Sequence, residues 1–192
     1  MFLNHYQITE RLNQGLISNP WDMDMLATSG IIQKYDKRAV NPASLDIHLG
    51  PSVLVEEAPV GHRVISYRDR ERLAMREVDL RQGPLILRPG QFILAATIER
   101  LAMPNDLACL LRIKSSMGRI GFEHLDAGWV DPGFEGALTL EYKNLTEHHS
   151  IELQWGDPIG QLCFAPVARL QDAESYKTVG RYGGHASVEQ IK

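Results

Sequence analysis

The sequence predicts a mainly β fold, a sandwich or distorted barrel with a few short helices. Its apolar runs are short, and turns rich in Gly and Pro separate them every ~8 to 12 residues, as is typical of all-β domains. The run over residues 137–142 alternates, so that Leu138, Leu140 and Tyr142 point one way and Glu141 points the other. A length of 192 residues suits one domain with a full core, spanning 1–192.

The elements follow in order along the chain. Residues 4–16 place Ile8, Leu12 and Leu16 on one face of a short amphipathic helix, and the region 21–38 carries no clear pattern. The strands expected after it are 44–49, 52–56, 64–67, 78–80, 85–87, 92–97, 107–113, 137–142, 150–154 and 159–167.

Turn signals add detail to this order. Gly50-Pro51 is expected to break the first β segment into two, and Pro89-Gly90 to hinge a hairpin between 85–87 and 92–97. The charged run 68–77 is expected to be a solvated loop.

Composition excludes several classes of function. The formal net charge of −4 gives no electrostatic footprint for nucleic acid. No apolar stretch approaches the ~18 to 20 residues that span a bilayer, and the N-terminus lacks the layout of a secretory signal. Cys109 and Cys163 lie in apolar runs, which favours buried thiols in a reducing, cytoplasmic setting over the alternative of a disulfide.

The segment 107–143 holds the residues best suited to chemistry, because two strand-like runs enclose a polar stretch. Within it, Lys114, Ser115, Ser116 and Arg119 offer two cations and two hydroxyls to a phosphate. No Walker-type glycine pattern accompanies them, so composition alone favours an ordinary helix start with surface charges.

Asp131 and Glu141 are two carboxylates near one loop–strand junction. Such a pair can divide acid–base and water-positioning duties, or it can be an Asx turn plus a salt bridge. The seven histidines show no metal-ligand spacing, and zinc-deaminase motifs are absent from the sequence. Any deamination of a base would therefore proceed without zinc.

Five motifs in the same order resemble the dCTP deaminase family of the trimeric dUTPase-like superfamily. They are NPASLDIHLG (41–50), LRPGQFILAATIERLAMPNDL (87–107), RIKSSMGRIGF (112–122), AGWVDPGFEGALTLEYKN (127–144) and DPIGQLCFAPV (157–167).

The resemblance implies a β-barrel-like core of the dUTPase type, assembled as a homotrimer whose active sites are shared between subunits. It implies conversion of dCTP and water into dUTP and ammonia, with Mg²⁺ bound through the nucleotide triphosphate. By the same resemblance Glu141 is the general acid and base, and Ser115 and Arg119 assist it.

The family also implies a wider set of nucleotide-binding residues. In this sequence they are Lys114, Ser115, Ser116, Arg119, His124, Asp126, Ala127, Trp129, Asp131, Phe134, Gln161, Tyr176, Arg181 and His185. Residues 1–40 are expected to form an N-terminal helix and loop, and residues 171–192 a flexible tail that closes over the triphosphate.

The chain departs from the family pattern at several places. Lys114 replaces an arginine, and Asp126 replaces a threonine, which leaves dTTP inhibition open and suggests a contact to a modified base or sugar. Gly128-Trp129 resembles the bifunctional deaminase–dUTPases.

The first interpretation is therefore a dCTP deaminase that releases dUTP. The nearest alternative is a bifunctional enzyme that yields dUMP and pyrophosphate, with Asp131 orienting a second water. Two further alternatives are an enzyme acting on a modified pyrimidine deoxynucleotide and a nucleotide-binding protein without catalysis.

Overall fold

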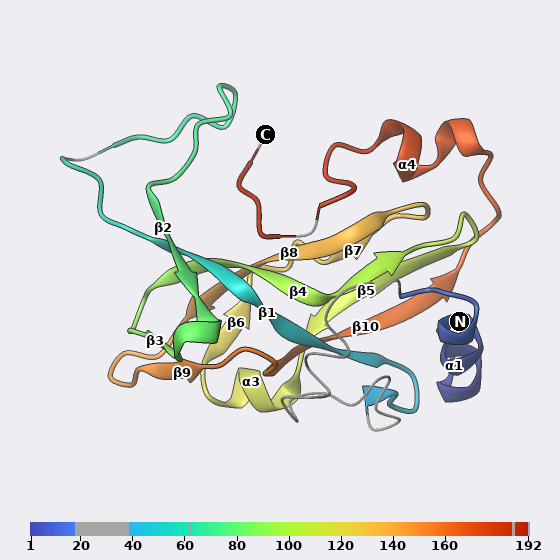
Figure 1. The fold of residues 1–192 in the computed structure, drawn as a ribbon, viewed down its shortest axis with the longest axis horizontal. Helices are drawn as coiled ribbons and strands as arrows, with labels where there is room; N and C mark the ends of the chain where they lie inside the picture. The colour runs from blue at the N-terminus through green and yellow to red at the C-terminus, as the bar shows by residue number, and fades with distance from the viewer. Residues whose placement is uncertain (18–38, 62, 186, 192) are drawn as a thin grey trace.

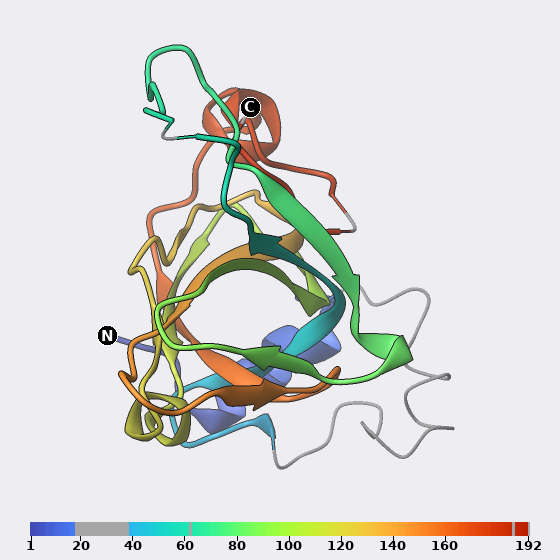
Figure 2. The same ribbon diagram turned by 90° about the vertical axis from the view of Figure 1, so that its left-hand side faces the viewer.

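The computed structural model describes residues 1–17, 39–61, 63–185 and 187–191. An eight-stranded antiparallel sheet dominates it, in the order β6-β8-β4-β1-β10-β5-β7, with β2 paired to β1. Figure 2 shows this sheet curling into a half-barrel around the core, with the helices at its margins. The predicted mainly β, barrel-like fold with few helices is confirmed.

The large sheet contains β1 (Leu45–Glu56), β2 (Met75–Asp79), β4 (Phe92–Ala102), β5 (Leu107–Ile113), β6 (Phe122–His124), β7 (Trp129–Val130), β8 (Glu135–Asn144) and β10 (Pro158–Pro166). A second sheet pairs β3 (Leu85–Leu87) with β9 (Ile151–Leu153). The helices are α1 (His5–Asn13), α3 (Ser115–Arg119) and α4 (Tyr176–Val179), with 3-10 turns at Leu80–Gln82 and Asp172–Glu174.

The N-terminal helix forms where the sequence predicts it. Asn4 caps α1 by accepting from the Gln7 N–H, and the Gln7 side chain accepts in return from the Asn4 N–H. Ile8, Leu12 and Leu16 are buried together, which confirms the predicted apolar face. The region 21–38 lies outside the described residues.

The prediction that Gly50-Pro51 ends a strand is wrong, because β1 runs unbroken from Leu45 to Glu56. The strand changes partner there, pairing with β10 before the glycine and with β2 and β4 around and after it. A Cβ on Gly50 would lie 2.7 Å from the Ala96 carbonyl oxygen. The glycine therefore allows β4 to approach closely.

Two other local predictions are also wrong. The segment 85–87 pairs with β9 and not with the strand after Pro89-Gly90, although Gly90 does form a turn with φ +75°. Residues 64–67 form no strand, because they lie in an exposed loop that contains part of the predicted charged run. The partner of 85–87 lies more than 60 residues away in sequence, a distance that local patterns do not reveal.

The core lies inside the half-barrel. Its largest fully buried side chains include Tyr142, Phe122 and Phe164, and the rings of Phe122 and Tyr142 stack with centroids 4.5 Å apart. Cys109 is buried, Cys163 is half-buried, and both are free thiols whose pKa is raised by burial. No helix in the described ranges has the length and apolarity needed to cross a membrane.

Candidate active site

A cavity of about 460 Å³ lies against the middle of β8. Its walls are mostly apolar, and its size falls in the range of small-molecule sites. The lining residues are Glu71, Leu73, Phe92, Leu94, Leu111, Ala127, Gly128, Trp129, Val130, Asp131, Phe134, Ala137, Leu138, Thr139, Leu140, Glu141, Tyr176, Tyr182, His185, Glu189, Gln190 and Ile191. They include seven of the site residues predicted from the sequence.

Glu141 lies in the cavity wall because β8 alternates as predicted. Leu138, Leu140 and Tyr142 are buried, while Glu141 opposes Leu94 of β4 and keeps 28% of its side chain exposed. Its Oε2 atom is buried and lies 3.4 Å from Nε2 of His124 on the neighbouring strand β6. The exposed part of the side chain therefore lies on the side that lines the cavity.

The segment from Ala127 to Phe134 forms a second wall. Gly128 is required there, because a Cβ would lie 2.6 Å from the Leu111 carbonyl oxygen. The indole N–H of Trp129 donates to Oδ1 of Asp131 over 2.8 Å, although the Trp129 side chain remains exposed. This bond fixes the Asp131 carboxylate at the cavity wall.

The C-terminal tail closes one side of the cavity. The Gly184 N–H donates to the Glu135 carbonyl over 2.7 Å, and the Ala137 N–H donates to the His185 carbonyl over 3.0 Å. These bonds extend the β8 ladder by one short segment. They leave His185, with Tyr182 and Glu189, on the cavity.

The helix α3 carries the remaining predicted catalytic residues, away from this cavity. Ser115, Ser116 and Arg119 are exposed, and Arg119 Nε donates to Ser115 Oγ over 3.4 Å. In both Figure 1 and Figure 2, α3 lies at the opposite end of the half-barrel from α4 and the tail. None of these three side chains lines the cavity that Glu141 lines.

Comparison with known proteins decides the family. A sequence model described as dCTP deaminase-like matches residues 18–167. The chain belongs to the dCTP deaminase-like family. A protein of Methanosphaerula palustris named "dCTP deaminase, dUMP-forming" is 34% identical over 96% of this chain and 91% of its own length. One of the same name from Acidothermus cellulolyticus is 42% identical over 69% of each chain.

Solved structures agree with this family. The structure of 2'-deoxycytidine 5'-triphosphate deaminase from Agrobacterium tumefaciens superposes with a TM-score of 0.63 at 25% identity. The match covers 90% of this chain and 50% of that chain. The resemblance read from the sequence motifs, to an enzyme family of hydrolytic deaminases, is therefore confirmed, whereas the roles of individual residues stay predictions.

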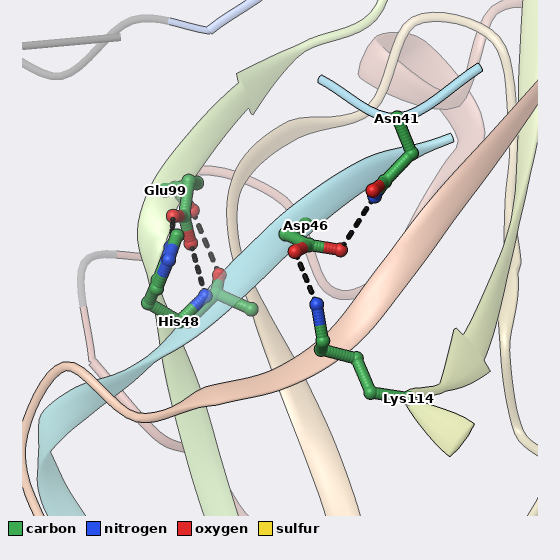
Figure 3. A network of polar contacts seen from close by, with 6 residues as sticks. Asn41, Asp46, His48, Glu99 and Lys114 are labelled. Atoms are coloured by element: carbon green, nitrogen blue, oxygen red, sulfur yellow. Dashed lines mark hydrogen bonds and ion pairs between the residues drawn. The ribbon is translucent and has the colours of Figure 1, made fainter. Parts of the chain in front are cut away.

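Lys114 and Gln161 each bind a polar side chain at or just before the start of β1. Figure 3 shows the Lys114 ammonium against the Asp46 carboxylate, which also accepts from Asn41 Nδ2 over 2.8 Å. Gln161 accepts from the Ser44 hydroxyl over 2.8 Å. Both predicted nucleotide-binding residues thus belong to the polar network at the start of β1, and neither lines the cavity.

The same figure shows a second ion pair, His48 with Glu99. Glu99 accepts from the His48 backbone N–H over 2.9 Å and contacts Nδ1 over 2.6 Å. Burial disfavours a charged His48, but the hydrogen bond and charge of Glu99 outweigh it and raise the pKa of His48 above its ordinary value. This pair links β1 to β4 where both strands depart from regular register.

Three other predicted residues also lie off the cavity. His124 is buried behind Glu141, with 4% of its side chain exposed. Asp126 points outward and accepts from Arg112 Nη1 over 2.6 Å. Arg181 is exposed at the start of the tail, outside the cavity lining.

Sequence reasoning missed two lining residues from the charged loop, Glu71 and Leu73. The one signal was Leu73, an apolar residue inside a charged run that was interpreted as solvated. Tyr182 and Glu189 were also missed, because the tail was expected to be flexible and its pairing with β8 has no local pattern.

Proposed function

We propose that this protein deaminates dCTP and then hydrolyses the triphosphate, so that dCTP and two waters yield dUMP, ammonia and pyrophosphate. The names of the related proteins, "dCTP deaminase, dUMP-forming", support this alternative over release of dUTP. The observation that carries the deaminase assignment is the half-buried Glu141 carboxylate in the wall of a largely apolar cavity.

In the first step Glu141 acts as general base and then as general acid. Its carboxylate takes a proton from water as the oxygen bonds to C4 of cytosine, and it delivers that proton to N3. A second proton passes from the new hydroxyl to the exocyclic amine. The C4–N bond then breaks, ammonia leaves and the C4 carbonyl of uracil forms. Apolar neighbours such as Leu94 and Leu138 exclude water and strengthen these contacts.

In the second step Asp131 orients a water toward the α-phosphorus and accepts its proton. The bond from this phosphorus to the bridging oxygen of the leaving diphosphate breaks, which releases pyrophosphate. The Trp129 indole holds one Asp131 oxygen, so the carboxylate enters the reaction already oriented.

Magnesium fits this site as part of the substrate. No group of three or more His, Cys, Asp or Glu side chains suited to a metal occurs in the described part of the chain. In this proposal the triphosphate oxygens would hold the ion, which would neutralise charge at the phosphates.

The cavity also needs cations that one chain does not place there. Its lining contains the carboxylates Glu71, Asp131, Glu141 and Glu189, and no Lys or Arg among the described residues. A triphosphate requires positive partners. We therefore propose self-association as a homotrimer, in which α3 of a second copy brings Ser115 and Arg119 to the cavity.

Product analysis tests the proposal. Purified protein is incubated with dCTP and Mg²⁺, and the nucleotides are separated by anion exchange over time while ammonia is measured. We expect dUMP and pyrophosphate as end products. Accumulation of dUTP as the end product would reject the second step, and dCTP binding without ammonia would reject deamination altogether.

A further inference from the structure

Both ring nitrogens of His124 face other parts of the protein and not solvent. Its side chain is 4% exposed, and its ring meets that of Tyr142 edge to face at 5.3 Å. It does not line the cavity, so it does not contact a nucleotide bound there. A buried imidazole next to a carboxylate requires an explanation in terms of the hydrogen bonds that it makes.

The proton on the ring can be placed from its neighbours. The backbone N–H of Asp126 donates to Nδ1 of His124 over 3.2 Å, so Nδ1 carries a lone pair. In the neutral ring the proton is then on Nε2. That atom lies 3.4 Å from the buried Oε2 of Glu141, and neither atom has another hydrogen-bond partner among the described residues. With the proton on Nδ1 instead, that N–H would face the backbone N–H of Asp126, and the lone pair of Nε2 would face the Glu141 carboxylate.

The backbone around His124 is built to hold this arrangement. Asp126 has φ +61°, in the left-handed region that Asp tolerates better than most residues. The Leu125 N–H donates to the Glu141 carbonyl over 3.0 Å, which ties the same turn to the residue whose carboxylate faces the ring. The turn therefore holds both the backbone and the side chain of Glu141.

We propose that His124 is the positioning residue of Glu141, presenting its Nε2–H to Oε2 so that the other carboxylate oxygen faces the substrate. This inference rests on the proposed function, because it assigns His124 a role through Glu141. A buried carboxylate oxygen without a donor is costly, and a charge-assisted bond removes that cost. The separation of 3.4 Å exceeds an ordinary hydrogen bond, and such bonds often tighten when the substrate binds.

Two variants separate positioning from packing. His124→Phe keeps the ring contact with Tyr142 but removes the donor, and we expect kcat for deamination to fall roughly 10- to 100-fold with KM within about twofold. His124→Gln restores a donor near the position of Nε2 and is expected to recover most of the rate. His148→Gln, at an exposed histidine, is the control and should match the parent protein. Unchanged kcat in His124→Phe would overturn the proposal.

The tautomer of His124 can be measured on the unsubstituted protein, so this test does not depend on whether a variant folds. Nitrogen-15 NMR of labelled histidines is expected to show His124 as the Nε2–H tautomer, and a proton on Nδ1 would overturn the proposal. Failure of the proposed function is distinguishable, since it would appear as full activity in Glu141→Gln or no deamination in the parent protein. Loss of activity in Glu141→Gln with full activity in His124→Phe rejects the positioning role alone.

Discussion

The two ends of the half-barrel carry opposite kinds of polar group. At the cavity, the charged side chains are carboxylates, and Glu141 is half-buried with its neighbours already in place. At the α3 end, Ser115, Ser116 and Arg119 are exposed, and Arg119 Nε donates to Ser115 Oγ. The proposed acid–base residue Glu141 therefore lies in the cavity wall, whereas the groups best suited to bind an anion, Ser115 and Arg119, lie on α3 away from it.

Lys114 sharpens this contrast, because it lies next to α3 and yet its charge is already paired. The Asp46 carboxylate faces its ammonium, and Asn41 holds that carboxylate from the other side. Of the two cations that the sequence offered to a phosphate, Arg119 is thus the better candidate. The comparison shows that a cation is available to a substrate only if it is exposed and no carboxylate already pairs with it, so its charge alone does not decide its role.

The cavity end is tested most severely by Glu141→Gln. The amide keeps the size of the side chain but cannot take a proton from water, so we expect deamination of dCTP to fall on the order of 10² to 10⁴-fold or more. Ammonia release gives the rate, and calorimetry with dCTP checks that binding survives. Glu152→Gln, on an exposed position of β9, is the matched control. Wild-type ammonia release from Glu141→Gln would remove this residue from the mechanism.

The relation between the two ends is tested by mixing two inactive variants. If each site takes Glu141 from one copy and Arg119 from another, trimers formed from Glu141→Gln and Arg119→Gln chains regain one intact site each. Unfolding and refolding an equal mixture is expected to restore about one quarter of the parent rate, because random assembly makes about three trimers in four mixed. Each variant refolded alone is the control. No recovery in a mixture that does form trimers would place both residues in one chain's site.

The tail is tested at Gly136, where β8 meets it. This glycine has φ +132°, and a Cβ would lie 3.0 Å from the His185 carbonyl oxygen and 3.1 Å from its nitrogen. Gly136→Ala should therefore push the tail from β8 and raise KM for dCTP by roughly three- to tenfold. Gly83→Ala carries a similar backbone strain, at φ +149°, with nothing within 4 Å of the added carbon. Equal KM values in the two variants would show that tail docking does not matter for binding.

The sequence correctly predicted the features that depend on short-range patterns, such as which side chains share one face of a strand or helix. The alternation of Leu138, Leu140 and Tyr142 placed Glu141 correctly on the opposite face of β8, and the spacing of Ile8 and Leu12 identified the buried face of α1. Both follow from backbone geometry alone, since strand and helix periods fix which side chains share a face. The family motifs then narrowed the mainly β prediction to a barrel-like core of the dUTPase type.

What the sequence could not give depends on pairing between distant segments. His124 meets Glu141 only because β6 pairs with β8, and the pairing of the tail with Glu135 and Ala137 joins segments about 50 residues apart. The partner change of β1 at Gly50 is equally invisible, because a glycine followed by proline reads as a turn until the neighbouring strand is known. Long-range register is set by the whole core, not by local preference.

The smallest effect that we expect concerns the network at the start of β1, and it separates fold stability from catalysis. The pKa of His48 is raised in the folded protein, so its contribution to stability is complete below the ordinary histidine pKa and is lost as the pH rises through the raised value. The groups that act on it are Glu99, Asp46 and Lys114. Urea unfolding at a series of pH values above 6.5 should show this decline.

His48→Asn keeps a donor near the position of Nδ1 but cannot titrate, so it should flatten that part of the stability curve. His148→Asn, at a side chain that is 81% exposed, should leave the curve unchanged. If the stability curve of His48→Asn ran parallel to that of the parent protein, protonation of His48 beside Glu99 would not be linked to folding. Because His48 and Glu99 do not line the cavity, kcat for dCTP should change little in His48→Asn, which would separate the effect on stability from the effect on turnover.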